Sequence, residues 1–197
     1  MKKLRSAFAR PTPSAPSPLA AAHRWILVAA LLGLVSVGMV MANELPERLT
    51  APQQVEAISA QEFEQLLEHH KGDVILVNLW ATWCIPCIQE LPDLSLLQER
   101  YRDRGLRIIA VSLDDPEKLE DKVRPFFAKR APELVSYLQT EDDQYDFVEV
   151  LSDEWFGALP TSFLISREGE VVLSQSGRML YAELEKEVLS ELDPKGP

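Results

Sequence analysis

The stretch VNLWATWCIPCIQELP, residues 77–92, contains both cysteines of the 197-residue chain. It begins inside a nearly continuous apolar run, 74–80, which is typical of a strand buried on both faces. From the first cysteine onward, apolar side chains recur at helical spacing over about 84–102, which predicts a helix. Cys84 and Cys87 are therefore expected where a buried strand meets the N-terminus of a helix.

That position suits reversible thiol–disulfide chemistry. Unpaired N–H groups and the helix dipole stabilise an anion at a helix start, so a thiol there has its pKa lowered from the usual value of ~8.5. Residues three apart share a helix face, so Cys84 and Cys87 can form a bridge. Pro86 fits the first helical turn, where its missing N–H is not needed. We expect Cys84 to be the exposed thiol that attacks and Cys87 to be the buried thiol that resolves the mixed disulfide.

Other interpretations of the cysteine pair fit less well. A structural disulfide that closes so short a loop removes little loop entropy, so stability is a poor reason for it. A structural zinc ion needs four ligands, and the chain has no further cysteine. His69 and His70 are predicted to end a helix and to face solvent. The sequence therefore indicates no metal site and no cofactor.

After residue 55, strand and helix signals alternate along the chain. Ser59 and Glu62 form a capping box, which predicts a short helix that reaches His70 and ends before Gly72. Further strands are expected over 107–113, near 134–138, over 161–166 and over 170–175. A further helix is expected to start at Asp115-Pro116, and Pro125 should bend or end that helix. Two more helices are expected over about 142–151 and over about 180–192. Such alternation implies parallel pairing and the last two strands form a hairpin, which predicts an α/β fold with a mixed sheet flanked by helices.

The N-terminal part is divided by charge and composition. Residues 1–24 are rich in proline and carry basic charges without an acidic one, which predicts an extended cytoplasmic tail. Residues 25–42 contain no charged side chain and just reach the length that spans a bilayer, so we expect a transmembrane anchor. A signal peptide is the alternative. Residues 43–55 are expected to be a linker, and residues 56–197 one folded domain.

The body of the chain is acidic. Residues 44–197 hold all 31 acidic residues and 15 of the 20 basic ones, a net charge of −16 that argues against nucleic-acid binding. Seven of the 14 residues in 141–154 are acidic. This segment is either a solvated face or a docking surface for basic partners. It lacks the spacing of an EF-hand loop, so calcium is not expected.

The motif WCIPC, residues 83–87, resembles the active site of the thioredoxin family. Pro92 stands where these proteins have a helix-kinking proline, and ALPTSFLI, residues 158–165, is similar to their cis-proline segment. The apolar N-terminal segment, Glu90 and the long segment 114–157 are similar in particular to the membrane-anchored TlpA/ResA-like branch of the family. The resemblance implies a thioredoxin-like fold with an inserted segment before the cis-proline strand.

The resemblance also implies roles for single residues. Pro160 would be the cis residue, and the backbone of Leu159 would pair with the substrate. Trp83, beside the reactive thiol, is expected to flank the partner-binding surface together with Pro86. Thioredoxins carry a buried Asp where this chain has Asn78, and an amide cannot accept a proton from Cys87. Glu90 is therefore expected to be the base for that thiol.

Taken together, these features predict a membrane-tethered protein thiol–disulfide oxidoreductase whose domain lies on the periplasmic side of the cytoplasmic membrane. No histidine separates Cys84 from Cys87, which favours reduction of protein disulfides over their formation. Cytochrome c maturation is a family-level setting for such a reductase. A membrane or extracytoplasmic dithiol would supply the electrons. The alternative is a non-catalytic thioredoxin-like module that docks a partner through its acidic insert.

Overall fold

The computed structural model describes residues 55–193. Its strands are β1 (Val55–Ile58), β2 (Val74–Trp80), β3 (Leu106–Ser112), β4 (Val135–Gln139), β5 (Thr161–Ile165) and β6 (Val171–Ser176). Its α-helices are α3 (Ala60–His69), α4 (Ile85–Tyr101), α5 (Arg124–Arg130), α6 (Gln144–Val148) and α7 (Tyr181–Leu192). Shorter helical segments are the 3₁₀ turns η1 (Arg102–Arg104) and η2 (Pro116–Lys118) and the π turn η3 (Leu119–Val123).

The six strands form one mixed sheet in the order β1-β4-β3-β2-β5-β6. The first four strands in this order run parallel, whereas β5 and β6 are antiparallel to their neighbours. The predicted α/β class, the mixed sheet and the antiparallel hairpin at its edge are therefore confirmed. β2 lies between β3 and β5, so the strand that leads to the cysteines is paired on both sides.

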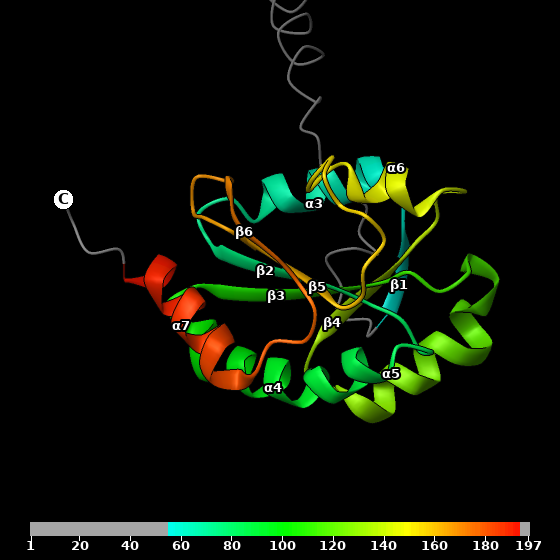
Figure 1. Cartoon of the computed structure of the whole chain (residues 1–197), viewed down its shortest axis with the longest axis horizontal. Coiled ribbons are helices and arrows are strands. Elements are labelled where there is room, and N and C mark those ends of the chain that lie inside the picture. Colours follow the sequence, from blue (N-terminus) through cyan, green and yellow to red (C-terminus); the bar gives the residue numbers. More distant parts are fainter. Residues whose placement is uncertain (1–54, 194–197) are drawn as a thin grey trace, which may run out of the picture. The chain divides into compact units, whose positions relative to one another are not determined.

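Helices cover both faces of the sheet (Figure 1). α3 and α6 lie on one face, and α4, α5 and α7 lie on the other. Successive side chains of a strand point to opposite faces, and β2 supplies both cores in this way. Leu76 and Trp80 pack in the cluster that contains α4 and α7, whereas Ile75 and Val77 pack in the cluster that contains α3 and α6. All seven residues of β2 are buried, as the apolar run predicts.

The helix α3 begins at its predicted capping box. The Ser59 hydroxyl accepts the backbone N–H of Glu62, and the Glu62 carboxylate accepts the backbone N–H of Ser59. Phe63 and Leu66 then face the core, where Phe63 stacks on Phe147 with ring centroids 4.9 Å apart. The helix ends at His69, just before the residue expected, and Gly72 forms the turn into β2 with φ +102°.

Three predictions about secondary structure need correction. Residues 55–58 were not expected to be a strand, yet they form β1 and pair with β4, and Val55 is fully buried. The segment after Asp115 is not one helix bent at Pro125: it passes from a 3₁₀ turn through a π turn into α5, and Pro125 lies in the first turn of α5. That place tolerates proline because no intrahelical N–H is needed there. The acidic helix is shorter than predicted, Gln144–Val148.

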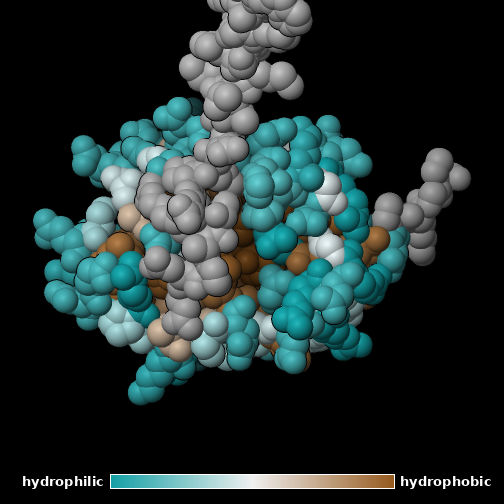
Figure 2. Space-filling model, turned by 180° about the vertical axis from the view of Figure 1, so that it is seen from behind, coloured by the Kyte–Doolittle hydropathy of each residue, from teal (hydrophilic) through white to brown (hydrophobic). Residues whose placement is uncertain are grey.

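The predicted tail, anchor and all of the linker except Val55 lie outside the described residues. Within residues 55–193, no helix has both the length and the apolar character that crossing a bilayer requires. The face of this domain that is seen from behind is hydrophilic over most of its area, with a hydrophobic region visible near its centre (Figure 2).

Candidate active site

The cysteine pair begins where β2 ends. The N–H of Cys84 donates to the carbonyl of Ala81 over 3.1 Å and closes a turn over 81–84. Cys84 is the N-cap of α4, and its carbonyl accepts the N–H of Ile88 at 3.1 Å. Its Sγ accepts the backbone N–H of Cys87 at 3.3 Å. The sulfur therefore occupies the place of an N-cap acceptor, where the free N–H groups of a helix stabilise negative charge.

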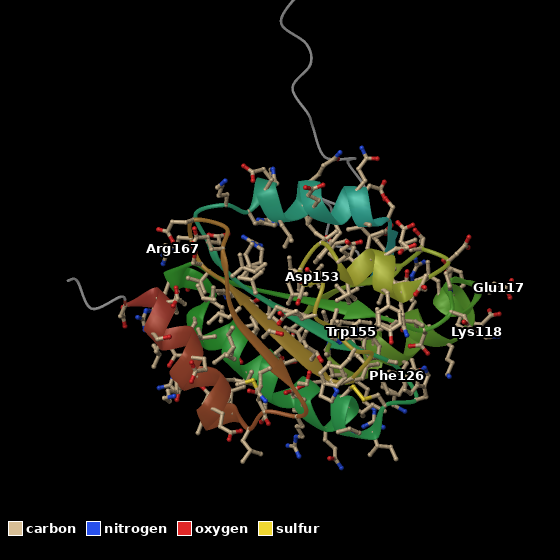
Figure 3. All side chains as sticks on the ribbon, turned by 45° about the horizontal axis from the view of Figure 1, so that its top comes forward. Glu117, Lys118, Phe126, Asp153, Trp155 and Arg167 are labelled. Atoms are coloured by element: carbon tan, nitrogen blue, oxygen red, sulfur yellow. A yellow bond between two sulfur atoms is a disulfide. The ribbon has the colours of Figure 1, made fainter. Side chains whose placement is uncertain are left out.

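Cys84 and Cys87 are joined by a disulfide, which Figure 3 draws as a yellow bond. Their Cα atoms are 5.3 Å apart, within the ordinary range for a bridge. Cys84 is 5% exposed and Cys87 is 0% exposed. The predicted order of exposure is correct, but Cys84 is far less exposed than expected because it sits in the turn and faces the core. A partner must therefore reach a cysteine that is almost entirely buried.

The residues around the pair are much more exposed than the two cysteines. Trp83 is 62% exposed and Ile85 is 68% exposed, although both have large apolar side chains. Pro86 is also exposed and occupies the first turn of α4, as predicted. Trp80, by contrast, is fully buried and packs against Phe127 with ring centroids 5.1 Å apart.

The Leu159–Pro160 peptide bond is cis, as predicted. It precedes β5, whose first residue, Thr161, is in register with Leu79 near the end of β2. Trp155, labelled in Figure 3, holds the segment ahead of this bond: its Nε1 donates to the carbonyl of Ala158 at 3.1 Å and to Oγ1 of Thr161 at 3.3 Å. The antiparallel pairing thus brings the proline segment to the sheet end from which the cysteine turn starts.

Glu90 is fully buried rather than on the surface. Its Oε1 accepts the backbone N–H of Met179 at 2.8 Å, and its Oε2 accepts Nδ2 of Asn78 at 3.0 Å. Asn78 Nδ2 also donates to Oγ of Ser162 at 3.0 Å, across the β2–β5 pair in which the two residues face each other. One turn of helix thus separates Cys87 from a carboxylate that is fixed by distant parts of the chain.

Burial raises the pKa of Glu90 above its usual value. The hydrogen bonds from Met179 and Asn78 and the positive charge of Arg178 act in the opposite direction, and Asp93 adds a small repulsion. Oδ1 of Asn78 is buried and has no hydrogen-bond partner in the described structure. Asn78 therefore has one acceptor oxygen that is not used. Because of its burial, the Glu90 carboxyl holds a proton more readily than a surface carboxyl does.

The sequence identified Glu90 by its position but did not reveal the partners that bury it. A second buried carboxylate, Asp114, was not predicted as a site residue at all; it hydrogen-bonds to Thr82, two residues before Cys84. The sequence predicted parallel strands, and residues that follow parallel strands lie at the same end of a sheet, but it did not predict that β2 and β3 are neighbours.

Among residues 55–193, no group of three or more His, Cys, Asp and Glu side chains is arranged to hold a metal ion. His69 is exposed, as expected. His70 is partly buried instead, and burial, with the positive charge of Arg107 adding to it, lowers its pKa to about 4.

Comparisons with known proteins agree with this geometry. A family model described as Redoxin matches residues 50–188. The thiol-disulfide oxidoreductase ResA of Geobacillus kaustophilus is 32% identical over 127 residues, which cover 64% of this chain and 68% of ResA. The thioredoxin-like protein YneN of Bacillus subtilis is 32% identical over 122 residues, 62% of this chain and 67% of YneN. The solved structure of a thiol:disulfide interchange protein, DsbE from Chlorobium tepidum, superposes with a TM-score of 0.53 at 29% identity and covers 64% of this chain and 84% of DsbE.

Proposed function

This chain belongs to the Redoxin family, as a TlpA/ResA-like protein with the thioredoxin fold, and from that premise we propose how it acts as a protein thiol–disulfide oxidoreductase. We propose that Cys84 and Cys87 form the redox pair and that the pair reduces disulfides in other proteins. The observation that carries the proposal is the position of the Cys84 sulfur, which accepts a backbone N–H at the N-terminus of α4.

In the proposed reaction, the Cys84 thiolate attacks one sulfur of a substrate disulfide. The bond between the substrate sulfurs breaks, the second substrate sulfur leaves as a thiolate that takes up a proton, and a mixed disulfide remains on Cys84. Cys87 then loses its proton and attacks the Cys84 sulfur, which releases the substrate as a dithiol. The enzyme is left with the Cys84–Cys87 disulfide, the state that the structure contains. Two electrons have passed from the pair to the substrate.

We propose that Glu90 accepts the proton that Cys87 loses. Glu90 follows Cys87 by three residues on α4, so both lie on one side of the helix. A buried thiol keeps its proton, and a nearby base with a pKa raised toward neutrality is suited to remove it. Glu90→Gln should therefore slow resolution of the mixed disulfide, with Glu99→Gln on the exposed side of the same helix as the control. Equal resolution rates in both variants would exclude this role.

We propose that the substrate docks on the exposed apolar residues beside the pair. Trp83 would contact the flanks of the substrate cysteine, and Pro86 would shape the helix start below it. The Leu159–Pro160 segment lies at the same sheet end, so the backbone of Leu159 is suited to pair with an extended substrate strand. The substrate class is accordingly an extended segment of protein that carries a disulfide.

We further propose that the domain works outside the cytoplasm, tethered by residues 25–42, and takes electrons from a membrane or extracytoplasmic dithiol. The uncharged run after a basic tail supports this topology. The absence of histidine between the cysteines supports the reducing direction, and cytochrome c maturation is a suitable setting. The full-length protein should stay in membranes after a carbonate wash. A soluble form that begins at Asn43 would show instead that the run is a cleaved signal.

The test of the redox role is capture of the mixed disulfide. Cys87→Ser removes the resolving thiol, so substrate proteins should accumulate on Cys84 as complexes that dithiothreitol releases. Cys84→Ser is the matched control, because it leaves one thiol in the same helix turn. Mass spectrometry of the released proteins then identifies the substrates. Complexes that form equally with Cys84→Ser would overturn the assigned order of the two thiols.

A further inference from the structure

Two carboxylates are buried in the described part of the chain, and each belongs to or contacts a segment next to the redox motif. Glu90 follows Cys87, whereas Asp114 approaches the turn ahead of Cys84. Asp114 is 3% exposed and comes two residues after the end of β3. The reaction described above does not use it.

The Asp114 carboxylate holds Thr82 at two points. Its Oδ2 accepts the backbone N–H of Thr82 at 2.8 Å, and its Oδ1 accepts the Thr82 hydroxyl. The Ser112 hydroxyl donates to the same Oδ2 at 2.8 Å. Nζ of Lys122 lies 3.9 Å from Oδ1, but its side chain is half exposed, so water screens part of its charge. The carboxylate is thus engaged by three hydrogen bonds and one partly screened cation.

Thr82 is one of the two central residues of the turn that delivers Cys84. The N–H of Cys84 donates to Ala81 at one end of this turn, and the N–H of Leu113 donates to the carbonyl of Trp80 at 2.8 Å just before it. The ends of β2 and β3 are thereby fixed to each other, and Asp114 ties the turn to that fixed edge. The negatively charged carboxylate contacts Thr82. Thr82 is two residues before Cys84, so the backbones of these two residues are about 7 Å apart or less.

We propose that Asp114 is a positioning residue that holds the turn 81–84 and biases the redox pair toward the disulfide. A buried negative charge near Cys84 opposes the thiolate, so it makes the dithiol form a stronger reductant. This inference rests on the proposed function, since it concerns the reactivity of Cys84. It also gives the reducing direction a physical source inside the fold.

Asp114→Asn separates the charge from the hydrogen bonds. A rotated asparagine amide can accept from the Thr82 N–H and the Ser112 hydroxyl and donate to the Thr82 hydroxyl, so the turn keeps its contacts while the charge is lost. Asp115→Asn is the matched control, because Asp115 is the next residue, is exposed and makes no capping hydrogen bond with its side chain. Both variants are made in the full-length protein.

The first measurement is the equilibrium with glutathione, in which two thiols are oxidised to glutathione disulfide as the protein disulfide becomes a dithiol. The measurement is made at a pH at which the Cys84 thiol is mostly ionised. There Asp114→Asn should shift this equilibrium toward the dithiol by on the order of threefold to tenfold. The pH midpoint for alkylation of Cys84 should fall by about 0.5–1 unit, which is the same change expressed as a protonation equilibrium. Lys122→Gln should move both quantities the other way.

The second measurement tests the positioning. Thr82→Val removes the hydroxyl contact and Thr82→Ser keeps it, so exchange with a protein disulfide should slow in the former and recover in the latter. If Asp114→Asn matches Asp115→Asn in both equilibrium and alkylation midpoint, or shifts them in the opposite direction, the inference is wrong. If the unaltered protein itself exchanges no disulfide, the proposed function fails instead, so the two failures are distinguishable.

Discussion

Replacing Glu90 by glutamine should change how the stability of the oxidised protein depends on pH. Burial raises the pKa of Glu90 in the folded protein above the ordinary 4.5, although Met179 and Asn78 donate hydrogen bonds to it. A group with a raised folded pKa contributes stability that is fully present below pH 4.5 and is lost as the pH rises through the folded pKa. Glutamine does not titrate, so the variant lacks this loss.

The size of the effect follows from the contacts. Each unit by which the pKa is raised makes the ionised carboxylate cost about 1.4 kcal/mol of stability at high pH. The introduced glutamine can still accept the N–H of Met179, and Asn78 can rotate so that its unpartnered Oδ1 accepts from the new amide. About one neutral hydrogen bond is then lost, at about 0.5–1.5 kcal/mol. Glu90→Gln should be less stable than the unaltered protein at pH 4 by about 1 kcal/mol, and this difference should shrink or reverse by pH 8.

Urea unfolding of the full-length protein at intervals between pH 4 and pH 8, with the disulfide kept oxidised, measures this difference. Glu99→Gln, on the exposed side of α4, is the control and should show no such trend. The reasoning would be refuted if Glu90→Gln were less stable than the unaltered protein by the same free energy of unfolding at every pH, or by more at higher pH. That result would mean that the hydrogen bonds to the carboxylate outweigh its burial.

Three further predictions concern other parts of the domain. Iodoacetamide should label Cys84 of the reduced protein faster than Cys87, because Cys84 caps the helix and is the less buried of the two; equal labelling, read by peptide mass, would contradict the assignment. Trp83→Ala should lower kcat/KM for a protein disulfide more than for a small aromatic disulfide, because the exposed indole is proposed to contact only the larger substrate; a uniform loss in both assays would count against a docking role. Ser59→Ala should lower the free energy of unfolding by about 1 kcal/mol through loss of the capping box, and an unchanged urea midpoint would show that the cap is replaced by water.

Local sequence patterns, such as apolar runs and helix caps, were sufficient to predict most of the strands and helices. β2 was predicted with its observed bounds, because a strand that is buried on both faces appears in the sequence as a nearly continuous apolar run. The four residues of β1 carry no comparable pattern, and only pairing with β4 makes them a strand. Pro125 was expected to disrupt a helix, but its effect depends on where a helix starts, and the π turn before it sets that start.

In the candidate site, too, some residues were predicted from the sequence, whereas contacts between distant segments were not. The cysteines were identified from their spacing at a predicted helix start, whereas Pro160 and Glu90 were identified through the resemblance to the thioredoxin family. The bond between Asn78 and Glu90 requires β2 to face α4, and the bond between Thr82 and Asp114 requires two strand ends to lie at one edge. Contacts of this kind depend on packing between distant segments. Neither residue type nor spacing specifies them before the sheet order is known.

The pairing of β2 with β5 has a consequence for how the protein is made. Asn78 and Ser162 face each other across these strands but are 84 residues apart in the chain. At ordinary translation speeds, about 4–17 s pass between the synthesis of one and the other. During that time two thiols stand beside an unfinished sheet, and a disulfide of another protein can exchange with one of them to form a mixed disulfide. Cys84 and Cys87 are only three residues apart, so the second thiol can attack this mixed disulfide, release the other protein as a dithiol and close the Cys84–Cys87 disulfide before β5 has been made.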